Sequence, residues 1–320
     1  MTETNPKTLF KYQRFGERLL EQLCGSRVYY ADPVTFNDPL DCQPIVSPDL
    51  PREDLQLLLG ELVVRRAREE IDIALKKLRW RGEKAQTRRD ALSQSEVRAI
   101  VGNIEYGATH PEVADPEEYV RSELALAIQA ELRKSYDMGV VCLSEKYDSP
   151  LMWSHYANQH RGICVEYAIT EPSMHAAHKV DYGQSRELPA SAVRDWLLDT
   201  HSAARNVVER ACLLTKSQEW AYEYEWRLLG PKGMGESPRI ESITFGLRCP
   251  LELQYAIVKS LEAIAPDIPF WAIHADTHFK LERTLVKVDE LLQSFPRASA
   301  MDFDILDPEP TTDALTQPSS

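Results

Sequence analysis

The chain has 320 residues, 43% of them hydrophobic, so it can bury a large core in one domain or two. Its net charge of −13 and its isoelectric point near 5.2 argue against general binding to nucleic-acid phosphates, although they leave room for a local basic patch. Because no stretch is long and apolar enough to cross a membrane and the N-terminus lacks the apolar segment of a signal peptide, we expect a cytoplasmic protein with no membrane partner.

The six cysteines are too far apart in the sequence to form a CxxC pair. A structural zinc site and a disulfide framework are therefore not expected, and we predict no metal. Cys142 and Cys164 lie in apolar runs typical of strands, where a thiol behaves as a small buried hydrophobic group.

The first 50 residues predict a strand or turn at residues 8–15, a helix at 16–23 and a strand at 28–30. A rigid loop follows, because Asn37 and Asp38 favour hydrogen bonds to their own backbone and Pro39 fixes its φ angle. Such loops often carry function, so this segment is either a binding loop or a plain structural turn.

Residues 51–135 predict a helical insertion that packs outside a sheet. An apolar stripe that includes Leu55, Leu59 and Leu62 begins it, and Ser95 and Asp115 are candidate caps of later helices. The many arginines of this block most simply form a solvated face, and the alternative is a docking surface for nucleic acid or protein.

Residues 151–167 concentrate aromatic and imidazole groups. Ser149 is a candidate N-cap and Pro150 the first residue of a short helix that carries Trp153, His155 and Tyr156. Gly162 ends this segment, and the residues that follow it have the character of a strand. The helix either plugs the core between two strands or forms one wall of a ligand pocket.

Residues 189–215 predict one long helix, and residues 216–229 predict one strand with alternating faces. One face would bury a row of aromatic side chains, while the other presents Glu223, Glu225 and Arg227. Two neighbouring carboxylates have separated pKa values unless a cation balances them, so this face holds either an ordinary surface ion pair or an active-site pair. Since Glu225 would face a cleft, Glu225→Gln is expected to leave folding little changed.

The remaining elements complete one α+β domain over residues 1–298, with residues 51–135 as its insertion. Strands are expected at residues 243–247, 270–274 and 279–286, a helix at 249–264, and a disordered acidic tail at 299–320. The strands at 28–30, 140–143, 163–167 and 222–229 are expected to share one sheet, because their apolar side chains have no other large partner.

Several blocks of the chain resemble, in order and spacing, the bacterial family called domain of unknown function 2971. These blocks are LFKYQRF, RVYYADPVTFNDPLDC, VVCLSEKYDSPLMWSHYANQHRGICVEY, KSQEWAYEYEWRLL and ITFGLRCP. The resemblance covers residues 8–281 apart from the helical insertion. The family name implies no activity.

The order of the blocks also resembles, more loosely, the ADP-ribosyltransferase superfamily. That resemblance implies a split, mixed or antiparallel sheet that binds NAD as a substrate. It also implies that Lys11 lies near ribose or phosphate, that Tyr30 stacks on nicotinamide, and that Glu225 is the catalytic carboxylate with Glu223 assisting it. Lys11 departs from the pattern, since the superfamily has arginine or histidine there.

The function expected from these resemblances is that of an NAD-dependent ADP-ribosyltransferase, as a toxin or phage-defence effector, with an unknown protein or nucleic-acid acceptor. The alternative is a non-catalytic domain that senses a ligand or binds a protein. The convergence of Lys11, Tyr30 and Glu225 on one cleft would favour the enzyme. The residues expected to bind the cofactor are Lys11, Tyr30, Asn37, Asp38, Trp153, His155, Tyr156 and Arg227.

Overall fold

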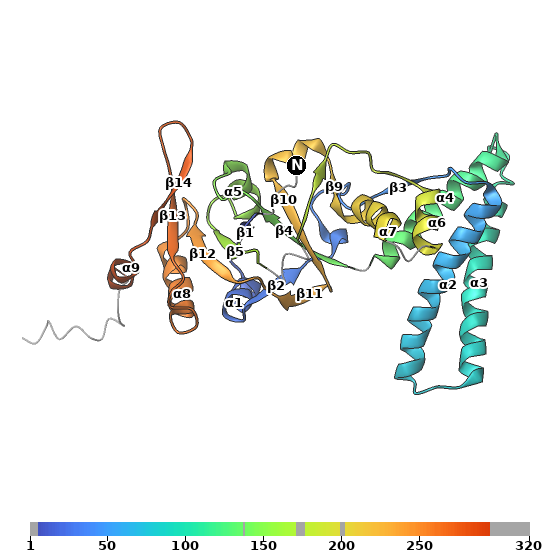
Figure 1. Cartoon of the computed structure of the whole chain (residues 1–320), viewed down its shortest axis with the longest axis horizontal. Coiled ribbons are helices and arrows are strands. Elements are labelled where there is room, and N and C mark those ends of the chain that lie inside the picture. The colour runs from blue at the N-terminus through green and yellow to red at the C-terminus, as the bar shows by residue number, and fades with distance from the viewer. Residues whose placement is uncertain (1–5, 137, 171–176, 199–201, 295–320) are drawn as a thin grey trace, which may run out of the picture.

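A curled eight-stranded sheet forms the middle of the molecule, with helices at both of its ends (Figure 1). The computed structural model describes residues 6–136, 138–170, 177–198 and 202–294. The fold is therefore α+β with a mixed sheet, as the sequence predicts. The tail at residues 299–320 lies outside the described residues.

The strand order in this sheet is β14-β13-β12-β5-β1-β4-β10-β6. Neighbouring strands are antiparallel except β12 and β13, which are parallel and flank helix α8 (Leu251–Glu262) in the chain. The strands are β1 (Thr8–Gln13), β4 (Gly139–Ser144), β5 (Ile163–Ala168), β6 (Ala177–Lys179), β10 (Glu225–Gly230), β12 (Ile240–Phe245), β13 (Phe270–Ala275) and β14 (Leu281–Leu285).

The sheet opens between β1 and β4. β1 pairs with β5 at all of its positions from Thr8 to Gln13, whereas its pairing with β4 is recorded at Phe10 and Ser144. Beyond that point the Lys11 side chain enters the gap and its Nζ donates to the Cys142 carbonyl at 3.3 Å. The separation of two neighbouring strands makes room for a pocket inside the sheet.

The two faces of the sheet are covered by different helices. On one face, Leu9 and Tyr167 pack with apolar residues of α1 (Glu17–Cys24) and α8. On the other face, Phe10, Tyr12 and Cys164 pack against α5 (Pro150–Tyr156). The alternation along β1 thus gives each face its own core.

Helix α5 begins as the sequence predicts. The Ser149 hydroxyl accepts from the Met152 N–H, and Pro150 is the first helical residue. Trp153 is fully buried: its Nε1 donates to the Tyr147 carbonyl at 2.8 Å, and its ring meets the Tyr12 ring edge-on at 5.2 Å. α5 is both a core plug and, through Tyr156, a pocket wall, so the two interpretations are compatible.

The insertion forms three helices outside the sheet: α2 (Arg52–Lys77), α3 (Glu83–Gly107) and α4 (Pro116–Ser135). Its core joins Leu55 and Leu59 of α2 to Leu124 and Ile128 of α4. Figure 1 shows α2 and α3 reaching away from the sheet as a hairpin. Asp115 caps α4 by accepting from the N–H groups of Glu117 and Glu118.

The prediction that Ser95 begins a helix is wrong, because α3 already starts at Glu83 and runs through it. The strand at 28–30 is also misplaced. It belongs to β2 (Arg27–Tyr30), which pairs with β11 (Gly233–Glu236) in a separate two-stranded sheet and reaches β4 by one bridge from Ala31 to Val140. Other short elements are η1 (Pro33–Thr35), β3 (Ile45–Ser47), β8 (Glu187–Pro189) and α9 (Val288–Ser294).

The long helix predicted at residues 189–215 is replaced by several elements. These are α6 (Ala190–Leu198), α7 (Ser202–Glu209) and the π-helix η3 (Arg210–Leu214), which leads into β9 (Thr215–Lys216). β9 pairs with β7 (Asp181–Tyr182). The apolar residues of this segment have a helical period, but the chain turns at its end. This turn brings Lys216 into contact with Glu223 and Glu225.

The single strand predicted at residues 216–229 is wrong in its first half. After β9 the chain forms the 3₁₀ helix η4 (Gln218–Glu223), and only β10 is extended. Tyr224 joins them in the left-handed region with φ at 47°, and its side chain is 49% exposed. The aromatic residues therefore do not form one buried row, although Trp226 and Leu228 are buried.

None of the described helices combines the length and the apolar character that a bilayer crossing requires.

Candidate functional site

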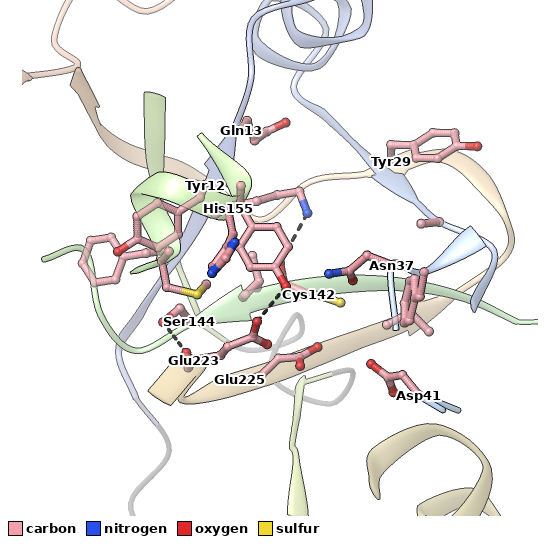
Figure 2. Close-up of a pocket in the computed structure, with 18 of the residues that line it drawn as sticks. Tyr12, Gln13, Tyr29, Asn37, Asp41, Cys142, Ser144, His155, Glu223 and Glu225 are labelled. Carbon is pink, nitrogen blue, oxygen red and sulfur yellow. Dashed lines mark hydrogen bonds between the residues drawn. The ribbon is translucent and has the colours of Figure 1, made fainter. Parts of the chain in front are cut away.

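A pocket of about 470 Å³ lies where β1 and β4 separate. β1, α1, the loop after β2, β4 and α5 form its walls, and Lys216, Glu223 and Glu225 reach it from the turn around η4. Figure 2 shows the carboxylates of Glu223 and Glu225 beneath Asn37 and His155. The volume is in the range of small-molecule sites.

Six of the residues predicted from the sequence line this pocket. Glu223 and Glu225 do so together with four of the residues expected to bind the cofactor, and the six come from four separate parts of the chain. The four cofactor-binding candidates are Lys11, Asn37, His155 and Tyr156.

The other four predicted residues lie beside or below the pocket. The Tyr30 ring packs closely against two glycines: a Cβ added to Gly230 would lie 2.8 Å from it, and one added to Gly235 would lie 2.7 Å from it. The neighbouring Tyr29 lines the pocket in its place. Asp38 accepts from Trp220 Nε1 at 2.8 Å. Trp153 is in the core under α5, and Arg227 is buried behind Glu225.

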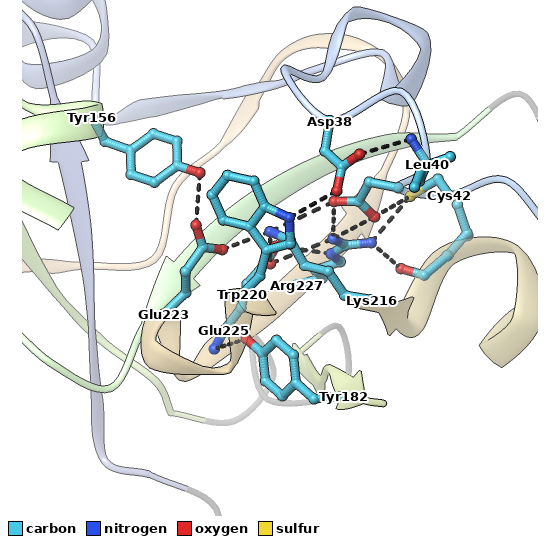
Figure 3. Close-up of polar contacts among 12 residues, drawn as sticks. Asp38, Leu40, Cys42, Tyr156, Tyr182, Lys216, Trp220, Glu223, Glu225 and Arg227 are labelled. Carbon is cyan, nitrogen blue, oxygen red and sulfur yellow. Dashed lines mark hydrogen bonds and ion pairs between the residues drawn. The ribbon is translucent and has the colours of Figure 1, made fainter. Parts of the chain in front are cut away.

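A buried network of charges forms the floor of the pocket (Figure 3). Lys216 Nζ contacts Glu223 Oε2 at 2.5 Å and Glu225 Oε2 at 2.8 Å. Arg227 donates from Nε to Glu225 Oε1 at 2.8 Å and from Nη2 to both Asp41 oxygens at 2.9 and 2.8 Å. Arg227 is 0% exposed and Glu225 2%, so water screens these charges little.

The floor carries one negative charge more than it balances when all its carboxyl groups are ionised. Asp41, Glu223 and Glu225 supply three carboxylates, against two cations from Lys216 and Arg227. A buried excess charge is costly unless it is protonated or meets a cationic ligand.

The two glutamates respond to this imbalance in opposite ways. Burial acts to raise the pKa of Glu225, but the charges of Arg227 and Lys216 outweigh burial and lower it to about 2. The pKa of Glu223 is raised, because burial and the negative charge of Glu225 outweigh Lys216. A pair of carboxyl groups whose pKa values are pushed apart is suited to separate charge-stabilising and proton-transferring roles.

Neutral groups fix the position of the two glutamates. Tyr156 donates its hydroxyl to Glu223 Oε1 at 2.7 Å, and Ser144 Oγ donates to the Glu223 carbonyl at 2.6 Å. The Tyr182 hydroxyl accepts from the Glu225 N–H at 2.8 Å. Residues of β4 and β7 therefore hold the backbone of the two glutamates, and Tyr156 of α5 holds the Glu223 carboxylate.

The opposite wall of the pocket carries positive charge. Burial lowers the pKa of Lys11, although Cys142 and Glu225 act to raise it. The Arg18 guanidinium lies 4.5 Å from the centre of the Tyr29 ring. A second hollow of about 690 Å³ continues past the start of α1, and Lys11, Arg18, Gln22 and His155 line both. Anionic groups of an extended ligand would find cations along this path.

One buried acceptor on this wall has no hydrogen-bond donor within the described part of the chain. Gln22 is 5% exposed, and its Oε1 makes no hydrogen bond to any described residue. An amide oxygen left without a donor is costly, so a ligand N–H or O–H is an appropriate partner for it.

Sequence reasoning missed Lys216, Asp41 and Arg18. Lys216 is the first residue of the block KSQEWAYEYEWRLL, and Asp41 is the last residue of the segment NDPLD. Both therefore lie in blocks that carry the family resemblance. A charged residue next to an apolar run could have indicated them, because a charged side chain that is buried there requires a partner of opposite charge. No group of three or more potential metal-binding side chains gathers within the described part of the chain.

The model of the family described as Protein of unknown function (DUF2971) matches residues 152–228. The matched segment begins in α5 and ends in β10, so it includes Tyr156, Lys216, Glu223, Glu225 and Arg227. The match supports the resemblance of the chain to that family. No curated protein and no solved structure matches the chain.

Proposed function

We propose that the protein is an NAD-dependent ADP-ribosyltransferase-like enzyme that breaks the bond between nicotinamide and ribose. The observation that carries this proposal is the set of three buried carboxyl groups on the floor of the pocket, Glu223, Glu225 and Asp41, against the two cations Lys216 and Arg227. Such a floor stabilises positive charge at the reacting centre, which is what glycosidic cleavage through an oxocarbenium-like state requires.

The proposed reaction begins with the cationic nicotinamide ring of NAD. Its ribose C1′–N bond breaks, the electron pair goes to the ring nitrogen, and neutral nicotinamide leaves. The ribose carbon becomes positive and is attacked by an oxygen or nitrogen of the acceptor, or by water. The nucleophile loses one proton as the new bond to C1′ forms.

Glu225 and Glu223 take different parts in this proposal. Glu225, with its lowered pKa, stays ionised and stabilises the positive ribose. Glu223, with its raised pKa and its contact to Tyr156, is the group that accepts the proton of the nucleophile. Lys11 and Arg18 bind the diphosphate along the second hollow, and the aromatic walls receive the nicotinamide ring.

The opening between β1 and β4 supports the split-sheet architecture that this superfamily would imply. A role as a toxin or phage-defence effector in the bacterial cytoplasm, with a protein or nucleic-acid acceptor, completes the proposal.

A second candidate is a non-catalytic domain that senses a ligand in the same pocket. One observation favours it: both oxygens of Glu225 are already engaged, Oε1 by Arg227 and Oε2 by Lys216. A carboxylate bound so fully by cations has less charge to offer a transition state. In this case the network would be structural and the ligand would only bind.

The two candidates are separated by measuring NAD binding by calorimetry and nicotinamide release by chromatography on the purified full chain. Binding with release that requires Glu223 supports the enzyme. Binding without release, with or without added protein or nucleic-acid acceptors, supports the sensing domain. A chain that neither binds NAD nor releases nicotinamide would overturn the NAD proposal in both forms.

A further inference from the structure

The tip of the α2–α3 hairpin is strongly basic in an acidic protein. Residues 76–88 hold six cations and one carboxylate, Glu83, whereas the whole chain has a net charge of −13. The cations are Lys76, Lys77, Arg79, Arg81, Lys84 and Arg88, and all six are exposed. This tip is the free end of the hairpin, on the side away from strands β1 and β4 (Figure 1).

The cations of the tip differ from those in the rest of the hairpin in their ion pairing. Nearer the core, Arg66 binds Glu70, Glu96 and Glu131, and Arg89 binds Asp72 and Asp90. None of the six tip cations has a carboxylate partner among the residues that the structure describes. Near the core, the arginines of the insertion are therefore paired with carboxylates. At the tip, residues 76–88, the positive charges are not neutralised by described carboxylates.

The core does not explain the length of the hairpin. The buried residues of α2 extend from Leu55 to Ala67, so its last ten residues contain none. At about 1.5 Å per residue, these carry the tip roughly 15 Å beyond the last buried residue of α2, and only Ala85 of α3 is buried at the tip itself. The large apolar cluster of the insertion therefore does not reach the tip, where all six cations are exposed.

Helix capping explains only part of the charge. Lys76 and Lys77 complement the C-terminal dipole of α2, but Lys84 lies in the first turn of α3, where a positive charge is unfavourable. The N-cap there is Gly82, which offers no side chain to the free N–H groups. An external anion at this position would satisfy those N–H groups and the nearby cations together.

The turn presents an aromatic ring between two arginines. Arg79 is left-handed with φ at 53°, and the Trp80 N–H bonds to the Leu75 carbonyl at 3.0 Å while the Arg79 N–H bonds to the Lys76 carbonyl at 3.1 Å. These two bonds form a Schellman motif that fixes the backbone of Trp80. Its side chain is 45% exposed.

We propose that residues 76–88 bind single-stranded nucleic acid, with Trp80 stacking on a base and the surrounding cations contacting phosphates. Aromatic rings interleaved with cations are the usual means of holding a single strand without base-specific contacts. A membrane surface fits less well, since the exposed Leu78 and Trp80 are surrounded by cations and no continuous apolar helix face adjoins them. The inference goes beyond the proposed activity and does not depend on NAD.

The test uses the purified full chain and a fluorescent oligonucleotide of about 20 deoxythymidines, long enough for a typical single-strand site, with binding followed by anisotropy. Affinity is expected to fall as salt rises from about 50 to 200 mM, and the triple change Arg79→Glu, Arg81→Glu and Lys84→Glu is expected to weaken it at least about ten-fold. Trp80→Ala is expected to weaken binding by about five-fold or more, while Trp80→Phe retains most of it.

The matched control is Lys7→Glu, Arg161→Glu and Arg248→Glu, three exposed cations outside the hairpin that change the net charge equally. This control is expected to stay within about two-fold of the wild type, since screening limits distant charges at this salt. Equal losses in the two triple variants, or no binding at low salt, would overturn the proposal. So would binding to phosphatidylserine vesicles with none to the oligonucleotide. Unchanged affinity in Trp80→Ala would overturn the stacking contact.

Discussion

Glu225 and Arg227 lie two positions apart on β10 and bind each other at 2.8 Å, with neither residue exposed by more than 2%. Both residues point to the same face of the strand, and Lys216 contacts the other carboxylate oxygen of Glu225, Oε2, at 2.8 Å. The carboxylate proposed to stabilise a reacting ribose is thus also a structural partner of a buried guanidinium.

We therefore predict that Glu225→Gln destabilises the fold by about 3–5 kcal/mol, because it leaves the Arg227 charge without one of its two carboxylates. This differs from the expectation of the sequence alone, which placed Glu225 on a cleft face. Urea unfolding of the wild type and the variant measures the change. Glu241→Gln, which breaks an exposed pair with Arg239, is the control and should cost less than about 1 kcal/mol. Equal costs would mean that burial of the network has no energetic weight.

For activity, Glu223→Gln is the cleaner test, because Glu223 has one cationic partner and its loss leaves Lys216 paired with Glu225. We predict that nicotinamide release falls by about two to three orders of magnitude, the size associated with losing one transition-state contact. Glu219→Gln, an exposed carboxylate on the same 3₁₀ helix, should leave the rate unchanged. If the Glu223 variant releases nicotinamide at the wild-type rate, Glu223 has no part in the chemistry.

Tyr156→Phe should move the pH dependence of the reaction. The tyrosine hydroxyl donates to Glu223 and acts to lower its pKa, so its removal raises that pKa further. If Glu223 must be ionised to accept a proton, the acid limb of the pH–rate profile shifts to higher pH. A rate loss with an unshifted profile would show that Tyr156 only positions the ligand.

Stability should also depend on pH through Glu225. Its pKa in the folded chain is lowered to about 2, so its contribution is present above the unfolded value of 4.5 and is lost as pH falls through about 2. The unfolding free-energy difference between the wild type and Glu225→Gln should then be constant from neutral pH to about pH 5 and shrink at lower pH. A difference that grows on acidification would contradict the sign of this shift.

Trp153→Ala should destabilise the protein by about 3–5 kcal/mol, as expected for a large core side chain that leaves a cavity. Trp80→Ala is the matched control, since Trp80 is 45% exposed and Trp153 is 0% exposed. Thermal melts of the two variants compare them directly. Similar melting temperatures would mean that α5 does not anchor the sheet.

Local patterns in the sequence were sufficient for most of the sheet and for α5. Strands such as β4, β5 and β12 have apolar runs bounded by turn residues, and Ser149 with Pro150 marks a helix start by its own chemistry. In the insertion, the apolar stripe that includes Leu55 and Leu59 predicted α2, and Asp115 predicted the start of α4. Ser95 is a residue type that often caps helices, but it lies inside α3, so it did not mark a helix start.

The failures share a different cause. The alternation of residues 220–228 is typical of a strand. The left-handed Tyr224 and the 3₁₀ helix before it are instead stabilised by the ion pairs of Lys216 with Glu223 and Glu225. The periodicity of the sequence does not reveal these tertiary contacts. The pocket itself joins β1, the loop near Asn37, α5 and η4, so only tertiary structure could bring its residues together. The sequence nevertheless identified Glu223, Glu225 and Arg227 as a group.

Assembly of the charged floor has a consequence for how the chain is made. Asp41 meets Arg227 across 186 positions, and the helical insertion lies between them. A growing chain exposes Asp41 and builds the hairpin long before Lys216 and Arg227 leave the ribosome. Because contacts so distant in sequence form late, any reaction in this pocket has to wait until synthesis has passed Arg227. Under the proposed activity, a nascent or truncated chain that lacks Lys216 and Arg227 would not consume NAD.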